Sequence, residues 1–302
     1  MIREATTWKL RTRALELGRR TLVMGVVNVT PDSFSDSFLI SEKAVGHAID
    51  LLDEGADIVD IGAESTRPGA RVSGGGSGTD APAVSAEEEQ ARLLPVLEGI
   101  MRARPAAIVS VDTYKADTAR AAIAAGAEIV NDVSGFLWGA GMETAAAEAK
   151  CGLVMMHTRG RPDEWATQAP LQPDEMMRLV KTGLEASLAR ATEAGIALES
   201  IVLDPGYGFG KRGGENFTLL RRQAELLELG RPLLTGVSRK SFLGRALAPL
   251  YGGATAPIDR RETASVAGMV AAILAGASIV RVHRVREAVE AALVADAVLG
   301  NG

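Results

Sequence analysis

The stretch Leu22-Val23-Met24-Gly25-Val26-Val27-Asn28 is an apolar run that stops at a polar side chain. The pattern recurs along the chain, with helix-compatible sequence between successive runs. The eight runs end at Asn28, Asp60, Asp112, Asn131, His157, Asp204, the triplet Ser238-Arg239-Lys240, and His283. Near-continuous runs of Val, Ile and Leu are typical of parallel strands that are covered on both faces. Eight such runs that alternate with helices predict a (β/α)8 TIM barrel.

The expected strands follow from the same runs. They span residues 22–27, 57–61, 107–111, 128–130, 153–156, 201–203, 233–236 and 279–282. Two helix starts have the spacing of a capping box, Ser85 with Glu88 and Asp259 with Glu262. In this type of barrel the residues at the carboxyl ends of the strands converge on one rim and carry the chemistry, so the stop positions outline a candidate site.

Length and composition agree with one large barrel. The chain has 302 residues, of which 47% are hydrophobic and only 4% aromatic, so it can bury one extended aliphatic core. We therefore expect residues 1–302 to form a single domain. The first residues, 1–20, fit neither the strand nor the helix pattern. Trp8, Leu10, Leu15 and Leu17 are expected to form a short hairpin or plug at the base of the barrel.

Charge and cysteine content exclude several classes of protein. A net charge of −5 without a block of Lys and Arg argues against a nucleic-acid-binding protein, which needs a basic face. The single cysteine, Cys151, excludes an internal disulfide framework. The chain starts without the apolar core of a signal peptide and has no run long enough to span a membrane, so we expect a cytoplasmic protein without membrane partners.

Two loops at the expected rim are long. The first covers residues 30–40, and the second covers residues 62–84 and includes the glycine-rich stretch 74–78. Long loops on the catalytic rim of a barrel are typically lids. The glycine-rich stretch lacks the Gly-Lys-Ser/Thr ending of a phosphate-binding loop. Residues 72–84 are therefore interpreted as a solvent-exposed insertion without chemistry of its own.

Four polar residues at the strand ends indicate the kind of ligand. Carboxylate and amide oxygens accept hydrogen bonds from a flat ligand rich in N–H groups, and an ammonium group donates to a carbonyl or ring nitrogen. Asp112, Asn131, Asp204 and Lys240 together match a 2-aminopyrimidinone edge. The alternative is that Asp112 and Asp204 only cap the helices that follow them.

Cations at the same rim indicate that the ligand is also anionic. Arg67, Lys240 and Arg281 supply positive charge in a chain that is acidic overall. Arg281 and His283 alternate along the last run, so they should share one face. The loops after the seventh and eighth strands are the usual phosphate site of this fold, which is where these two residues stand.

The histidines do not indicate a zinc site. They stand in separate elements and, with a single cysteine, show no zinc-ligand spacing. His47 is expected on a helix surface, His157 is left open between ligand contact and structural hydrogen bond, and His283 could instead be bonded to backbone. A weakly held Mg²⁺ that bridges ligand phosphates and protein oxygens fits better, with Asn28 as a protein ligand.

Five longer motifs resemble those of the dihydropteroate synthase family. They are Val27-Asn28-Val29-Thr30-Pro31-Asp32-Ser33-Phe34-Ser35-Asp36, Asp60-Ile61-Gly62-Ala63-Glu64-Ser65-Thr66-Arg67-Pro68-Gly69, Asn131-Asp132-Val133-Ser134-Gly135, Asp204-Pro205-Gly206-Tyr207-Gly208-Phe209-Gly210-Lys211 and Gly236-Val237-Ser238-Arg239-Lys240-Ser241-Phe242. They follow the family's order, and the resemblance runs from about Trp8 to the end of the last helix. Long contiguous motifs in order are far more specific than a lone glycine pattern.

The resemblance implies a reaction and a set of roles. The family condenses 6-hydroxymethyl-7,8-dihydropterin diphosphate with p-aminobenzoate, which gives 7,8-dihydropteroate and diphosphate. The implied pterin contacts are Asp112, Asn131, Asp204, Lys240, Arg281, Met156, Phe209 and Gly236. The implied diphosphate contacts are Asn28, Arg67, Arg281 and His283, with Mg²⁺ as the cofactor. The implied p-aminobenzoate contacts are Ser241, Thr66, Pro68, Phe34 and Phe209.

The same resemblance implies a mechanism in which diphosphate leaves before the amine attacks. The expected catalytic residues are Asp112, Lys240, Arg67 and Asp36. Mg²⁺ and the arginines would neutralise the leaving group, while Asp112 and Asp36 would stabilise the pterin cation that remains. Closure of both loops would exclude water from that cation. The family also implies a homodimer and competition between sulfonamides and p-aminobenzoate.

Two other functions share parts of this site. A methyltetrahydrofolate-dependent methyltransferase domain has the barrel and the pterin rim, but it does not need the residues of the first loop or the p-aminobenzoate corner at Ser241. A non-catalytic pterin-binding paralogue would keep the pocket without turnover. The chain also departs from the family in the first loop, where Ser37 and Phe38 replace paired glycines, and in the glycine-rich insertion of the second.

Overall fold

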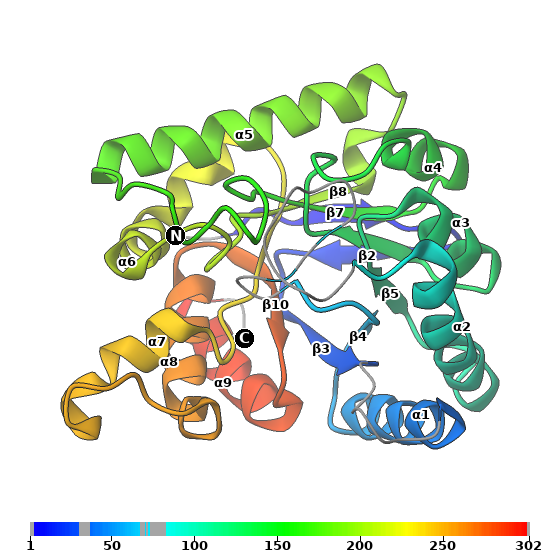
Figure 1. The fold of residues 1–302 in the computed structure, drawn as a ribbon, viewed down its shortest axis with the longest axis horizontal. Helices are drawn as coiled ribbons and strands as arrows, with labels where there is room; N and C mark the ends of the chain where they lie inside the picture. The colour runs from blue at the N-terminus through cyan, green and yellow to red at the C-terminus, as the bar shows by residue number, and fades with distance from the viewer. Residues whose placement is uncertain (1–2, 30–36, 67–69, 71, 73–82, 301–302) are drawn as a thin grey trace.

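Eight parallel strands form a closed barrel in the computed structural model, which describes residues 3–29, 37–66, 70, 72 and 83–300. Around the barrel they follow the order β10-β3-β4-β5-β6-β7-β8-β9 (Figure 1). The strands are β3 (Leu22–Asn28), β4 (Ile58–Gly62), β5 (Val109–Asp112), β6 (Ile129–Asp132), β7 (Gly152–Met156), β8 (Ile201–Asp204), β9 (Leu233–Thr235) and β10 (Ala277–Val282). The predicted (β/α)8 class is confirmed, and each predicted strand overlaps an observed one.

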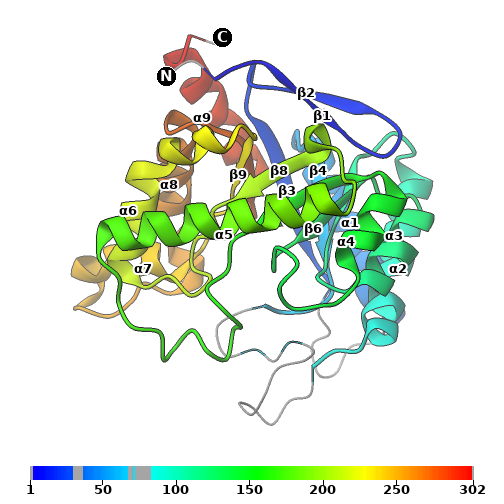
Figure 2. The ribbon, with the colours of Figure 1, turned by 90° about the horizontal axis from the view of Figure 1, so that it is seen from above.

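Helices surround the barrel (Figures 1 and 2). The α-helices are α1 (Ser37–Asp53), α2 (Ala86–Ala103), α3 (Ala116–Ala124), α4 (Met142–Ala149), α5 (Pro173–Glu193), α6 (Gly213–Arg222), α7 (Ser241–Ala246), α8 (Glu262–Leu274) and α9 (Val285–Val298). Short 3-10 helices are η1 (Leu198–Ser200), η2 (Gln223–Leu229), η3 (Ala248–Tyr251) and η4 (Ile258–Arg260). Because α1 begins at Ser37, the first loop is shorter than predicted. Within the described ranges no helix is long and apolar enough to cross a membrane.

The two predicted capping boxes differ from the observed helix starts. Ser85 Oγ accepts a hydrogen bond from the Glu88 N–H at 3.1 Å, but the Glu88 carboxylate pairs with Arg92 one turn later in α2. The second prediction is wrong, because Asp259 belongs to η4 and Arg261 holds the N-cap position of α8. A separate 3-10 turn before the helix shifts the cap, and a fixed three-residue spacing does not reveal such a turn.

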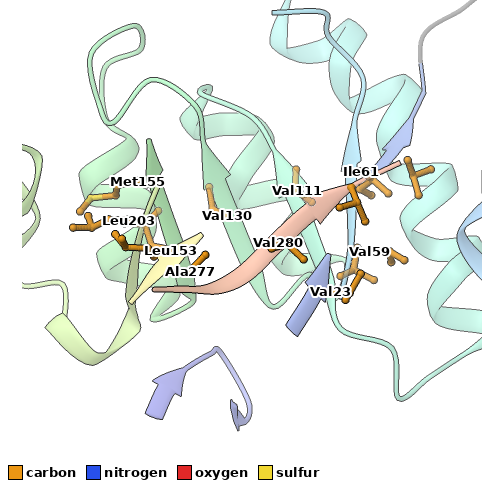
Figure 3. Close-up of a cluster of buried hydrophobic side chains, with 14 of the residues drawn as sticks. Val23, Val59, Ile61, Val111, Val130, Leu153, Met155, Leu203, Ala277 and Val280 are labelled. Atoms are coloured by element: carbon orange, nitrogen blue, oxygen red, sulfur yellow. The ribbon is translucent and has the colours of Figure 1, made fainter. Parts of the chain in front are cut away.

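Alternation along the strands divides the buried core into two layers. Val59, Val111 and Leu153 belong to the larger layer, which packs between the barrel and the helices (Figure 3). Neighbouring residues in the strands point the other way. Ile58 and Val154 belong to a second apolar cluster, which fills the lower interior of the barrel. The barrel interior is thus a packed core rather than a pore.

A hairpin closes the base of the barrel, as predicted. It consists of β1 (Thr6–Lys9) and β2 (Ala14–Leu17), with Trp8 opposite Leu15, and it lies across one end of the barrel (Figure 2). Trp8 and Leu17 are fully buried against the inner apolar cluster. Trp8 Nε1 also donates to the carbonyl oxygen of Ser200 at 2.8 Å, so the indole is both packed and satisfied.

Candidate active site

Above the inner apolar cluster, the barrel interior becomes polar. Side chains alternate along β4, so Asp60 faces the same interior as Ile58, and the strand register sets Asp60 beside Ser110 of β5. Both side chains are fully buried. Asp60 Oδ1 and Ser110 Oγ have no hydrogen-bond partner among the described residues. Buried oxygens of this kind are normally satisfied by a ligand or an ordered water.

Arg281 of β10 bridges carboxylates from two other strands. Its Nε lies 2.6 Å from Asp60 Oδ2, and its Nη2 lies 2.7 Å from Asp112 Oδ2. Asn131 Nδ2 donates to the same Asp60 oxygen at 3.1 Å. Burial by itself lowers the pKa of Arg281, but the charges of Asp60 and Asp112 outweigh it and raise the pKa, so the guanidinium stays charged. The structure therefore joins the predicted residues Asp112, Asn131 and Arg281 in one network.

Asp112 has an unusual charge state within this network. Burial raises its pKa to about 7, and the charge of Arg281 opposes that rise only in part. The neighbouring carboxylates Asp60, Glu89 and Asp132 contribute to the same rise. A ligand that brings an N–H donor or a positive charge to Asp112 would favour its ionised form.

Asp204 and Lys240 lie close enough to influence each other's protonation. Burial raises the pKa of Asp204 and lowers that of Lys240 to about 8, and the charge of each residue opposes the shift of the other. Lys240 Nζ donates to the carbonyl oxygen of Tyr207 and lies 4.3 Å from the centre of the Phe209 ring. The ammonium group is thus held beside an aromatic face at the rim.

The alternative in which Asp112 and Asp204 only cap helices is wrong. Asp204 Oδ1 accepts a hydrogen bond from the Gly206 N–H at 2.7 Å, whereas α6 begins only at Gly213. The N-cap position of α3 is Lys115. Gly206 itself has a φ of +70°, and a Cβ there would come within 1.9 Å of the His157 carbonyl oxygen, so only glycine fits this turn.

An open cavity of about 360 Å³ adjoins these residues, and we call it the rim cavity. It is lined by Asn28, Thr66, Trp165, Tyr207, Gly208, Phe209, Ser238, Arg239, Lys240, Ser241, Ile258, Arg261 and His283. It brings together two residues predicted to bind diphosphate, Asn28 and His283, and three predicted to bind p-aminobenzoate, Thr66, Phe209 and Ser241.

The three histidines have different surroundings. His283 Nδ1 lies 2.9 Å from Ser238 Oγ, so this side chain helps to orient its ring at the rim cavity. The ring of His157 instead packs against α5, where a Cβ added at Gly183 would come within 2.5 Å of its Cδ2. Burial lowers the pKa of His157 well below its usual value, so this ring is neutral and structural. His47 is exposed on α1, as predicted.

The remaining predicted contacts divide into two groups. Met156 is buried at the end of β7, and Gly236 adjoins Arg281, whose Cβ would lie 3.7 Å from a Cβ added at that glycine. The other predicted contacts, Phe34, Asp36, Arg67 and Pro68, lie outside the described residues.

Sequence reasoning missed three features of the site. Asp60 was expected at a strand end, but it lies inside β4, and its position two residues after the inward-facing Ile58 is the signal that it also faces inward. Trp165 forms a wall of the rim cavity, and nothing in the strand pattern marks it. Val72 is only 3% exposed and packs with Met156 and Trp165, so the interpretation of residues 72–84 as solvent-exposed is wrong at that position.

One side chain at the rim cavity, the amide of Asn28, has an oxygen of the kind that binds Mg²⁺. Among the residues that the structure describes, no group of three or more His, Cys, Asp and Glu could hold a metal ion. Asn28 is exposed at the end of β3 and borders the rim cavity together with His283. An amide oxygen is a suitable Mg²⁺ ligand, and Mg²⁺ usually completes its coordination with water and substrate phosphates.

Proteins of known function resemble this chain over most of its length. The pterin binding enzyme family matches residues 24–283. The dihydropteroate synthase of Mycobacterium leprae is 44% identical over 93% of this chain and 94% of its own length. The solved structure of Xanthomonas albilineans dihydropteroate synthase with 4-aminobenzoic acid is 39% identical, with a TM-score of 0.83 over 98% of both chains. That of the Yersinia pestis enzyme with a sulfonamide drug is 37% identical, with a TM-score of 0.85 over 98% of this chain and 100% of that one.

Proposed function

The chain belongs to the dihydropteroate synthase family of pterin-binding enzymes, and we propose that it condenses 6-hydroxymethyl-7,8-dihydropterin diphosphate with p-aminobenzoate to give 7,8-dihydropteroate and diphosphate. One observation carries this proposal most directly. Arg281 joins Asp60 and Asp112 while Asn131 binds Asp60, so a network of donors and acceptors lines the upper interior of the barrel. The rim cavity beside it contains the residues expected for a second, aromatic substrate.

The pterin binds at the polar level of the barrel. Its amino and ring N–H groups need acceptors, which Asp112, Asn131 and Asp204 supply. Its carbonyl and ring nitrogens need donors, and Lys240 already donates to a carbonyl in this structure. Met156, Phe209 and Gly236 border the flat faces of the ring. The unpartnered Asp60 Oδ1 lies beneath, where it accepts a hydrogen bond from the pterin or from a bridging water.

The diphosphate binds at the side of the rim formed by β3 and β10. Asn28, His283 and Arg281 are the described residues at this side, and Arg67 joins them by resemblance to the family. Asn28 would hold Mg²⁺, which when bound supplies positive charge to the diphosphate oxygens. His283 is kept in place for this contact by Ser238.

p-Aminobenzoate binds in the rim cavity. Ser241 is the first residue of α7, and its hydroxyl binds the carboxylate of the substrate. Phe209 contacts the aromatic ring, and Thr66 borders the cavity from the second loop. Phe34 and Pro68 complete this pocket by resemblance to the family. The amine nitrogen then faces the pterin methylene carbon.

The residues of the site then carry the reaction in two steps. The bond between the pterin methylene carbon and the diphosphate oxygen breaks, and the electron pair leaves with diphosphate, whose new charge Arg281 and Arg67 stabilise. Asp112, with Asp36 from the first loop, stabilises the methylene cation that remains. The amine nitrogen of p-aminobenzoate donates its lone pair to form the C–N bond and releases a proton to water. An arylammonium is acidic enough that this step needs no dedicated base.

A direct assay tests the proposal. Purified protein with Mg²⁺, the pterin diphosphate and p-aminobenzoate should form 7,8-dihydropteroate and release an equal amount of diphosphate. The methyltransferase alternative predicts methyl transfer from methyltetrahydrofolate and no dihydropteroate. If folded protein binds the pterin diphosphate but forms no product, the chain is a non-catalytic paralogue.

We also propose that the protein is a cytoplasmic homodimer. The support is an apolar strip on α9, where Leu293, Val294 and Val298 are 63%, 67% and 70% exposed. Isolated exposed apolar residues are ordinary, but three on one helix end favour contact with another surface. Sedimentation should give twice the mass of the chain, and Leu293→Glu should shift the protein toward the monomer. Cell fractionation tests the location.

A further inference from the structure

A buried ion cluster beside the pterin network has no role in the chemistry above. Lys115 Nζ lies 3.2 Å from Glu89 Oε2 and closer still to Glu64 Oε2. The side chains of Lys115, Glu64 and Glu89 are only 8%, 5% and 1% exposed. Buried ion pairs are weak evidence for stability, because their attraction must offset the loss of hydration of every charge. The position of the cluster therefore needs another explanation.

Hydroxyl groups add hydrogen bonds to this cluster, although Glu89 Oε1 has no hydrogen-bond partner among the described residues. Thr113 and Thr118 donate to Glu89 Oε2 at 3.1 and 2.7 Å. Tyr114 donates to Glu64 Oε1 at 3.2 Å. Burial by itself lowers the pKa of Lys115, but the two carboxylates outweigh it and raise the pKa, so the ammonium group is charged at neutral pH. The contacts around Lys115 are thus specific and directed.

The cluster connects the two substrate sides of the active site. Glu64 stands two residues before Thr66, which lines the rim cavity. Glu89 lies in the first turn of α2, at the other end of the second loop. Lys115 stands three residues after Asp112, the strand-end carboxylate of the pterin network. The ammonium group of Lys115 therefore ties both ends of the second loop to the segment that carries Asp112.

We propose that Lys115 is a positioning residue. It keeps the segment with Thr66, on the p-aminobenzoate side of the rim cavity, at a fixed position relative to Asp112 on the pterin side. This inference rests on the proposed function. Lys115 acts through Glu64 on the segment that carries Thr66, and through its own backbone on Asp112. The amine nitrogen must meet the pterin methylene carbon beside Asp112, and a misplacement of about 1 Å can reduce the rate by about 100-fold.

Steady-state kinetics of Lys115→Met test the proposal, because displacement of the segment with Thr66 affects the two substrates differently. The KM for p-aminobenzoate should rise about tenfold or more, while the KM for the pterin diphosphate should stay within about twofold of wild type. The variant should also release more diphosphate than dihydropteroate, because a displaced amine leaves the methylene cation to water. Glu64→Gln should change the same quantities in the same direction. In the double variant, the rise in the KM for p-aminobenzoate, expressed as a free energy, should be smaller than the sum of the rises in the two single variants. The reason is that both substitutions remove the same contact.

A buried ion pair at the base of the barrel provides the matched control. Arg3 and Asp296 are paired with side chains only 2% and 6% exposed, and Asp296 also accepts a hydrogen bond from the Thr21 N–H at 2.7 Å. Asp296→Asn should lower the melting temperature without changing either KM or the ratio of the two products. This control separates displacement of the active-site segment from a general loss of stability.

The outcomes are distinguishable. If Lys115→Met does not fold, Glu64→Gln decides, because glutamine keeps the size of the side chain but removes the negative charge that pairs with Lys115. An unchanged KM for p-aminobenzoate in a folded variant, or an equal rise of both KM values, would overturn the proposal. If the wild-type protein itself forms no dihydropteroate, the proposed function fails. The affinities for the pterin diphosphate and for p-aminobenzoate are then measured separately on wild type and variants. They replace the two KM values, and the same outcomes apply.

Discussion

Arg281 Nη2 contacts Asp112 Oδ2 at 2.7 Å, although β3 and β4 separate their strands in the barrel. The contact fixes the direction of the Asp112 carboxylate, yet burial still raises its pKa to about 7. Arg281 also serves Asp60, so its single positive charge is shared by two acids. A carboxylate that is held in place but incompletely neutralised is well suited to stabilise a cation that forms next to it.

Replacement of Asp112 by asparagine should reduce kcat by about 100-fold or more, because the reaction loses a charge already directed at the forming cation. The amide has nearly the same shape, so binding of the pterin should suffer less than turnover. Rapid-quench measurement of a single turnover, with pterin affinity from calorimetry, separates the two effects. A single-turnover rate near that of wild type would remove Asp112 from the mechanism.

The pH profile of kcat/KM for the pterin diphosphate should be bell-shaped. Asp112, with a pKa of about 7, must be ionised to stabilise the methylene cation, so activity falls as pH drops below that value. Lys240, with a pKa of about 8, must be protonated to donate, so activity also falls as pH rises above that value. Lys240→Arg should move only the alkaline limb upward, because a guanidinium keeps its proton. An alkaline limb that does not move would assign it to another group.

Removal of divalent metal should abolish dihydropteroate formation, because the charge on the leaving diphosphate is then poorly neutralised. Dialysis against a chelator followed by titration with Mg²⁺ measures this dependence. Asn28→Ala should need a higher Mg²⁺ concentration for half-maximal rate. Full activity in thoroughly metal-free protein would exclude the assigned role of Asn28.

Sulfonamides should inhibit by competing with p-aminobenzoate, because both are aromatic amines that fit the rim cavity. The apparent inhibition constant should rise linearly with the p-aminobenzoate concentration. Ser241→Ala should weaken inhibitor and substrate together if the hydroxyl binds both. Inhibition that stays constant as p-aminobenzoate increases would contradict the assignment of this cavity.

Trp8→Ala should lower the free energy of unfolding by about 3–5 kcal/mol, the usual range when a large buried aromatic is truncated. Trp8 is fully buried at the base, far from the rim cavity, so both KM values should stay near wild type. Urea unfolding and steady-state kinetics on the same preparation provide the two measurements. Trp165→Ala is the contrasting variant, because Trp165 lines the rim cavity and its loss should raise the KM for p-aminobenzoate.

Much of the fold and the site could be predicted because each strand of a closed barrel carries a strong local pattern. The apolar runs gave the strands, and their polar ends placed Asp112, Asn131 and Asp204 on one rim. Arg281, predicted at the rim as a source of positive charge, contacts Asp60 inside the barrel. The roles of these residues, the bound Mg²⁺ and the single domain over residues 1–302 stay predictions.

The remaining features depend on contacts that a linear pattern does not contain. His157 follows β7 directly, but it packs against Gly183 of α5, and only the tertiary structure brings that glycine to it. Val72 is buried because it packs against aromatic residues that are distant in the sequence, such as Trp165. Asp259 lost its predicted capping role because a 3-10 turn precedes α8. In each case the neighbour that determines the outcome is remote in sequence or belongs to an irregular segment.

The hairpin beneath the barrel affects the order in which substrates bind and the product dissociates. Since Trp8 fills the lower end, the pterin diphosphate enters from the rim, and 7,8-dihydropteroate departs by the same route. In the proposed arrangement, p-aminobenzoate sits nearer that opening than the pterin does. If it arrives first, it obstructs the path to Asp60 and Asp112, so productive turnover starts with the pterin diphosphate.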